Sequence, residues 1–184
     1  MFKGIAMIDL SKLNKEQKKI IADLHSPDEE IIVDTLCRIR EVGDEYCIDP
    51  MIEVFFTTPF ANVRDEIGRV FLDLKSAKVS KQILESLSGY MNHELIGEFI
   101  SNLWQSSVVF DDVTPFVEKF VVADDMLALD CLSLVENNLG NISGESLARS
   151  REIVRSNYHS FDGMKKQLAE DLISILESRS EYES

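Results

Sequence analysis

Apolar residues recur along most of the chain at the spacing of one face of an α-helix. Four sets of three residues have the spacing i, i+4 and i+7, and they begin at residues 32, 63, 96 and 127. Because side chains at this spacing lie on one side of a helix, each set predicts a helix with one buried stripe. The four sets are Ile32, Leu36 and Ile39; Val63, Ile67 and Val70; Ile96, Ile100 and Leu103; and Leu127, Cys131 and Leu134.

These sets repeat with an almost constant period. Successive sets start 31, 33 and 31 residues apart, and a step of this size is typical of repeat proteins. A shorter apolar set follows each of the first three, which predicts pairs of helices joined by short turns. The second helices carry Ile48, Ile52 and Phe55; Val79, Ile83 and Leu87; and Val113, Val117 and Phe120.

The pattern predicts an all-α fold, an α-α superhelix of about four helix pairs with capping helices at both ends. Amphipathic segments at 10–24 and 161–177 predict the terminal helices, since the end repeats of a solenoid need a cover with one polar face. We expect a single domain over residues 1–184. Its expected parts are an N-terminal cap in 1–25, four repeats in 26–157 and a C-terminal cap helix in 158–178.

Residues that favour helix starts precede several of the predicted helices. Asp124 stands before the fourth long helix and Asp28 before the first, where an acidic side chain can accept hydrogen bonds from the first turn. The third long helix is expected to start at Asn92 or His93, after a glycine.

Residues 60–74, FANVRDEIGRVFLDL, resemble the first helix of a HEAT repeat. Val63-Arg64 and the small Gly68 occupy the positions that this family gives to Val-Arg and to the small residue where two helices approach closely. The other predicted repeats lack the arginine. Their regular period extends the resemblance to roughly residues 26–157. The resemblance implies an α-solenoid like those of small bacterial HEAT-repeat proteins, and a surface that binds other molecules. HEAT folds also host a few enzymes.

Acidic residues outnumber basic ones, 33 to 19, and give the chain a formal net charge of −14. Since binding to a phosphate backbone depends on clustered cations, we expect no nucleic acid partner. No apolar run has the length of a membrane span or of a signal-peptide core, so we expect a cytoplasmic protein with no membrane partner. Three scattered cysteines, Cys37, Cys47 and Cys131, agree with free thiols in a reducing compartment.

The sequence contains no recognisable catalytic or metal-binding motif, so we expect no metal, no cofactor and no enzymatic activity. The three histidines lie far apart and have no metal-ligand spacing. Acidic pairs such as Asp111-Asp112 are explained more simply by helix capping. Trp104 is either an exposed anchor for a partner or a packing residue between repeats, and its register within the repeat favours packing.

In HEAT-like solenoids the second helix of each pair usually lines the concave face, so the resemblance implies a binding groove there. Its side chains would be mixed in charge but net acidic. This favours a non-enzymatic scaffold or adaptor that binds a protein or peptide of basic character, because opposite charge speeds encounter. The predicted binding residues are Asp49, Glu53, Lys81, Gln82, Glu85 and Glu118.

Three other interpretations stay open. An inhibitor or immunity-type protein that neutralises a basic partner would carry the same acidic charge. A HEAT-fold enzyme, lyase-like or DNA-glycosylase-like, would need a catalytic group, and the glycosylase would also need a basic concave face. The plainest interpretation is that these residues form a solvated helix face.

Overall fold

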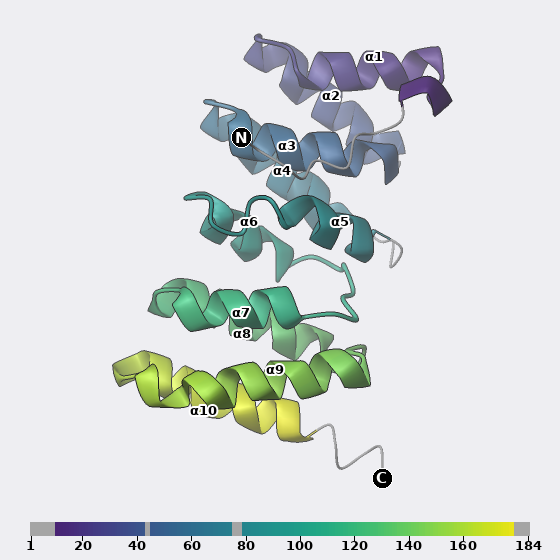
Figure 1. Ribbon diagram of the computed structural model, residues 1–184. Helices are drawn as coiled ribbons and strands as arrows, with labels where there is room; N and C mark the ends of the chain where they lie inside the picture. Colours follow the sequence, from purple (N-terminus) through teal and green to yellow (C-terminus); the bar gives the residue numbers. More distant parts are fainter. Residues whose placement is uncertain (1–9, 43–44, 75–78, 179–184) are drawn as a thin grey trace. The chain divides into compact units, whose positions relative to one another are not determined.

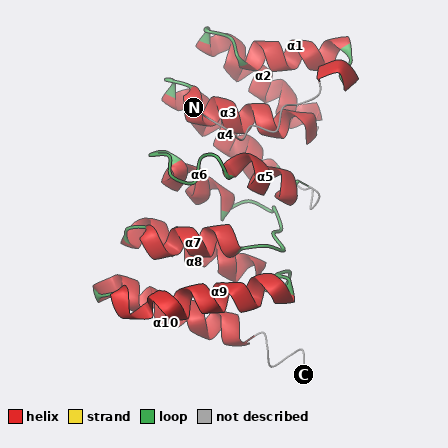
Figure 2. Ribbon diagram, viewed as in Figure 1, coloured by secondary structure: helices red, strands yellow, loops and turns green. Residues whose placement is uncertain are grey.

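The computed structural model describes residues 10–42, 45–74 and 79–178. Within these residues every regular element is a helix and none is a strand, which confirms the all-α class (Figure 2). Short 3-10 turns accompany three of the α-helices. The elements are η1 (Leu10–Lys12), α1 (Lys15–Leu24), α2 (Glu29–Val42), η2 (Glu45–Cys47), α3 (Ile48–Thr57), α4 (Ala61–Asp73), α5 (Ser80–Leu87), α6 (Ile96–Leu103), α7 (Thr114–Val122), α8 (Asp125–Asn138), α9 (Gly144–Asn157), η3 (Tyr158–Ser160) and α10 (Gly163–Ser178).

The chain forms two compact units. Unit 1 comprises Met1–Ile96 and Ser106–Val108, and unit 2 comprises Gly97–Gln105 and Val109–Ser184. The predicted helices are present, but in the described part of the chain the sequence neighbours that pack closely are α1 with α2, α3 with α4, α7 with α8 and α9 with α10. The predicted pairing of each long helix with the shorter helix after it, such as α2 with α3 or α4 with α5, is not seen among these packed pairs. The superhelix and the single domain over residues 1–184 stay predictions.

Unit 1 has two layers of helices. In Figure 1, α1, α3 and α5 form one layer, and α2 and α4 lie behind them. Contacts between α1 and α3, between α3 and α5, and between α2 and α4 hold each layer together, while α1 packs on α2 and α3 packs on α4. The predicted stripes on α2 and α4 are buried, and the core is filled by side chains such as Leu24, Leu36, Phe55, Ile67 and Phe71.

Unit 2 repeats this arrangement. α7 packs on α8 and α9, and α10 packs on α8 and α9 (Figure 1). α6 lies beside α8, since a Cβ atom at Gly97 would lie 3.8 Å from Leu127 Cδ1. The core of unit 2 includes Phe116, Phe120 and Leu172.

Two helix starts follow the prediction. The Asp124 carboxylate accepts the backbone N–H of Leu127 at 2.9 Å and caps α8. The Asp28 carboxylate accepts the N–H of Glu30 at 3.0 Å, just before α2. The expected terminal helices are also present as α1 and α10; residues 1–9 of the expected N-terminal cap lie outside the described residues.

The predicted start of the third long helix is wrong. α6 begins at Ile96 rather than at Asn92 or His93. Residues 88–95 form turns instead, with the N–H of His93 bonded to the carbonyl of Tyr90 at 2.8 Å. The Tyr90 ring stacks on Phe56 at 4.3 Å between centroids, so a contact with α3 holds this segment out of the helix.

Candidate functional site

Five of the six predicted binding residues lie on two neighbouring helices of unit 1. Asp49 and Glu53 are on α3, while Lys81, Gln82 and Glu85 are on α5. The two helices pack against each other, and the Ser86 hydroxyl of α5 donates a hydrogen bond to the Asp49 carboxylate of α3. The structure therefore brings these five residues together on one pair of helices, which we call the α3–α5 face.

Local partners already engage much of the charge on the α3–α5 face. Glu53 lies 3.5 Å from Nε2 of His25, whose other ring nitrogen, Nδ1, lies 2.8 Å from the carbonyl of Ile21. Lys81 lies 3.8 Å from Glu85 along α5, and Gln82 donates to the carbonyl of Glu45 at 3.3 Å. The α3–α5 face is therefore mixed in charge. Its exposed ion pairs are weak, because water screens the attraction between the two charges.

Glu118, the sixth predicted residue, belongs to unit 2. It is exposed on α7 and pairs with Arg149 of α9 at 2.9 Å. α9 also carries Arg151 and Arg155, which the sequence analysis left out of the predicted face. The acidic character of α3 does not extend to α9.

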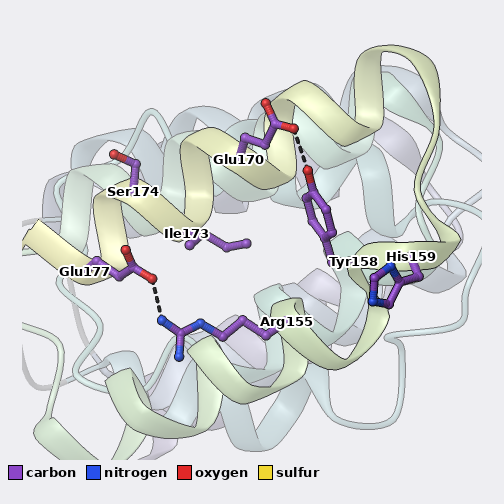
Figure 3. Close-up of a pocket in the computed structure, with 7 residues that line it drawn as sticks. All are labelled: Arg155, Tyr158, His159, Glu170, Ile173, Ser174 and Glu177. Atoms are coloured by element: carbon purple, nitrogen blue, oxygen red, sulfur yellow. Dashed lines mark hydrogen bonds and ion pairs between the residues drawn. The ribbon is translucent and has the colours of Figure 1, made fainter.

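A shallow pocket of about 410 Å³, which we call the α9–α10 pocket, opens between the end of α9, η3 and the second half of α10 in unit 2 (Figure 3). Ile173 forms an apolar part of its wall, between two polar clusters. No prediction placed a site here, because the pairing of helices beyond residue 140 cannot be fixed from the repeat pattern. Its lining residues are Arg155, Tyr158, His159, Glu170, Ile173, Ser174 and Glu177.

Both carboxylates of this pocket are bonded within the protein. Arg155 Nη2 lies 2.5 Å from Glu177 Oε1, and the Tyr158 hydroxyl donates to Glu170 Oε1 at 2.5 Å (Figure 3). The hydrogen bond to Glu170 raises the pKa of Tyr158 above its ordinary value, because it holds the phenol in its protonated form. Tyr158 is therefore a hydrogen-bond donor at neutral pH and a poor base.

The three cysteines differ in their exposure to solvent. Cys37 is exposed, whereas Cys47 and Cys131 are buried, and burial raises the pKa of Cys131 to about 12. A thiol with such a pKa is a weak nucleophile. Among the described residues no three His, Cys, Asp or Glu side chains are grouped so that they could hold a metal ion.

Trp104 is half-buried at the end of α6. Its indole nitrogen is buried, and its carbonyl accepts a hydrogen bond from Asn137 of α8 at 2.8 Å. These contacts agree with the packing role that its register favours. No helix in the described part of the chain has the length and apolarity that a membrane crossing requires.

Comparison with protein-family models, with curated proteins and with solved structures found no match for this chain.

Proposed function

We propose that the chain is a non-enzymatic protein-interaction module that binds a basic segment of a partner protein through the α3–α5 face. The observation that carries the proposal is the grouping of Asp49, Glu53 and Glu85 on two packed helices. Opposite charge on a partner would speed its encounter with such a face and orient it. The formal net charge of −14 favours the same class of partner.

Within this proposal the helix pairs are those of a HEAT-like solenoid in a cytoplasmic protein. The 31–33-residue period and the burial of Gly68 inside α4, after Val63-Arg64, support the solenoid. Free thiols at Cys37, Cys47 and Cys131 support a reducing compartment.

Binding is favoured over catalysis by the chemistry of the α9–α10 pocket. Glu170 and Glu177 each accept a hydrogen bond or ion pair from the protein itself. A general base needs a poised pKa and an accessible lone pair, whereas Tyr158 is held protonated by the hydrogen bond that raises its pKa.

The proposal is tested by affinity capture with the full chain as bait. One variant reverses the face (Asp49→Lys, Glu53→Lys, Glu85→Lys). A matched variant reverses three exposed acids of α2 (Glu30→Lys, Asp34→Lys, Glu41→Lys), which changes the net charge equally. We expect the wild type and the α2 variant to retain one basic partner that the face variant loses, and circular dichroism to show that all three chains are folded.

Salt should weaken this capture, since a Debye length falls to a few ångströms at about 1 M salt. A separate Glu118→Lys variant measures whether α7 takes part. Loss of the partner from both reversed variants would contradict a local face and reduce the interaction to net charge. Inhibition of a captured basic enzyme would select the inhibitor form of the proposal, and binding of duplex DNA at physiological salt would overturn it.

A further inference from the structure

Large apolar side chains are exposed around α8 of unit 2. Among the described residues six large hydrophobic side chains are exposed, and four of them lie in unit 2. Two belong to α8, one ends α7 and one lies in the first turn of α10. Their exposed fractions are 71% for Val122, 70% for Met126, 41% for Leu129 and 56% for Met164.

Lys165 brings two of these residues, Val122 and Met164, to one place. Its ammonium group donates hydrogen bonds to the carbonyls of Val121, at 2.8 Å, and of Ala123. This fixes the start of α10 at the turn between α7 and α8. Val122 stands between the two bonded carbonyls, and Met164 precedes the lysine in sequence.

Met126 and Leu129 continue the exposed apolar side chains along α8. They are three residues apart, so they lie on neighbouring turns of one helix face. The opposite side of α8 is also apolar, with Ala128, Cys131 and Leu134 buried. A helix with apolar residues on both sides normally has both sides covered. We call Val122, Met126, Leu129 and Met164 the α8 patch.

The surroundings of the α8 patch are mixed in charge with an excess of acidic residues. Five acidic and three basic residues lie within four positions of its members in sequence: Glu118, Asp124, Asp125, Asp130 and Asp162 against Lys119, Lys165 and Lys166. No lysine or arginine occurs in residues 120–148, whereas Asp125 and Glu136 are exposed at the two ends of α8. Lys165, the basic residue at the turn, is occupied by backbone carbonyls, and burial lowers its pKa despite the attraction of Asp125. A partner on this surface would therefore meet apolar side chains beside an excess of negative charge.

We infer that the α8 patch is a docking site for an amphipathic helix of a partner protein that carries lysine or arginine beside its apolar stripe. Such helices bind grooves and faces through apolar side chains at i, i+3 or i+4, and i+7. Methionine side chains adapt their shape to different apolar partners, which suits Met126 and Met164 to this role. The acidic ends of α8 orient the basic flanks of the bound helix.

Methyl NMR on the full chain tests this inference, with the methionine methyl groups labelled with ¹³C. The probe is a synthetic helical peptide of about 20 residues, with leucine at i, i+3 or i+4 and i+7 and lysine at the flanking positions. We expect the Met126 and Met164 methyl signals to shift on titration. The Met51 signal should stay unchanged, because Met51 is buried in unit 1.

Matched variants separate apolar contact from charge. Met126→Ser with Met164→Ser should weaken the peptide about ten-fold or more, since both side chains are anchors. Ile31→Ser with Leu72→Ser, which removes two exposed apolar side chains of unit 1, should leave the affinity unchanged. A peptide with glutamate in place of lysine should bind more weakly than the lysine peptide. Thermal unfolding checks that both variants are folded.

Three results would overturn the inference: no shift of the two methyl signals at saturating peptide, equal affinity for the glutamate peptide, or a dimer of the free chain that the Met126→Ser, Met164→Ser variant dissolves. The last would assign the patch to a second copy of this chain. The α8 patch shares no residue with the α3–α5 face, so either proposal can fail while the other stands.

Discussion

Both units have exposed ion pairs between helices of one layer, and unit 2 adds buried hydrogen bonds to a non-helical segment. In unit 1 the contacts between helices of one layer include exposed ion pairs, such as Arg40 of α2 with Asp73 of α4 at 2.6 Å. In unit 2, Glu118 of α7 pairs with Arg149 of α9 in the same way, but buried hydrogen bonds also join the segment before α7 to α8 and α9. The carboxamide oxygen of Asn138 accepts the N–H of Phe110 at 2.7 Å, and the Ser146 hydroxyl accepts the N–H of Val113 at 3.0 Å.

The difference follows from the backbone. The segment before α7 is buried at Phe110 and Val113 but is not helical, so its N–H groups have no helical partner. Side chains of α8 and α9 supply the missing acceptors, as buried amides require. An exposed ion pair contributes little to stability, whereas an unsatisfied buried N–H costs about 1–3 kcal/mol. Unit 2 is thus the more sensitive to loss of single polar side chains.

The largest expected effect is a difference in labelling rate between the exposed and the buried cysteines. Cys37 is exposed, Cys47 is buried in η2 of unit 1, and Cys131 is buried in the middle of α8 of unit 2. We expect Cys37 to react at once with a disulfide reagent, and both buried thiols to react at least about a thousand-fold more slowly, because they need an opening of the structure. Mass spectrometry after timed quenching identifies each labelled cysteine.

The relative labelling rates of the two buried thiols, Cys47 and Cys131, compare the two units directly. Cys47 lies in a short 3-10 turn, so local opening exposes it sooner than Cys131, which is inside a long helix. The variant Cys37→Ser removes the fast signal and leaves the two slow ones. Equal rates for Cys47 and Cys131 would mean that the two units open together.

The next largest effect is expected from Asn138→Ala in unit 2. The substitution leaves the buried N–H of Phe110 without its acceptor and removes the bond from Asn138 to the Leu134 carbonyl, 2.8 Å away. We expect the free energy of unfolding to fall by about 2–3 kcal/mol. Urea unfolding followed by circular dichroism measures the loss. The control is Asn137→Ala next to it, whose exposed side chain should contribute less than about 1 kcal/mol.

Similar losses for Asn138→Ala and Asn137→Ala would show that water reaches Phe110 and would remove the contrast between the units. Fluorescence of Trp104 adds a second probe, since it is the single tryptophan of the chain and lies in unit 2.

The helices could be predicted from the sequence because their signals are local. Apolar stripes such as Ile32, Leu36 and Ile39 depend on spacing alone, and the Asp124 cap depends on a residue three positions away. The late start of α6 could not be predicted, since Tyr90 is held by Phe56 across the space between α3 and the turn after α5. Its cause is a tertiary contact rather than a propensity.

The candidate site was harder to predict for the same reason. The apolar spacing places Asp49 and Glu53 on the second helix of the first predicted repeat and Glu85 on the second helix of the next repeat. These helices are α3 and α5, and they pack together in the structure. Spacing does not reveal that Ser86 bonds to Asp49 or that Arg149 bonds to Glu118. Exposure of the α8 patch also depends on which side of α8 its neighbours cover, and a helix with apolar residues on more than one side does not specify this by its pattern.

A smaller effect is expected from two serines that link helices in the two units. Ser146→Ala removes the acceptor of the buried Val113 N–H and a donor to Asp112, so we expect a loss of about 1–2 kcal/mol. Ser86→Ala removes the bond to Asp49, whose half-exposed carboxylate regains water, so the loss should stay below about 1 kcal/mol. Urea unfolding of both variants gives the comparison, and a larger loss for Ser86→Ala would reverse it.

The smallest expected effect is a pH dependence of the stability that Ser146→Ala removes, measured as free energy of unfolding. Burial alone would raise the pKa of Asp112, but hydrogen bonds from Thr114 and Ser146 outweigh it and lower the pKa. A carboxyl with a lowered pKa in the folded state stabilises the fold above the pKa of the unfolded chain, and this contribution is lost as the pH falls through the folded pKa. Ser146→Ala removes one of these bonds, so the pKa of Asp112 should rise in the variant. The difference in unfolding free energy between wild type and variant should therefore narrow below about pH 4.

Urea unfolding at neutral and acidic pH measures this difference, and a carboxyl NMR titration follows Asp112 itself. If the difference stays constant while the Asp112 titration is the same in both chains, Ser146 stabilises unit 2 through the Val113 N–H and not through the carboxylate.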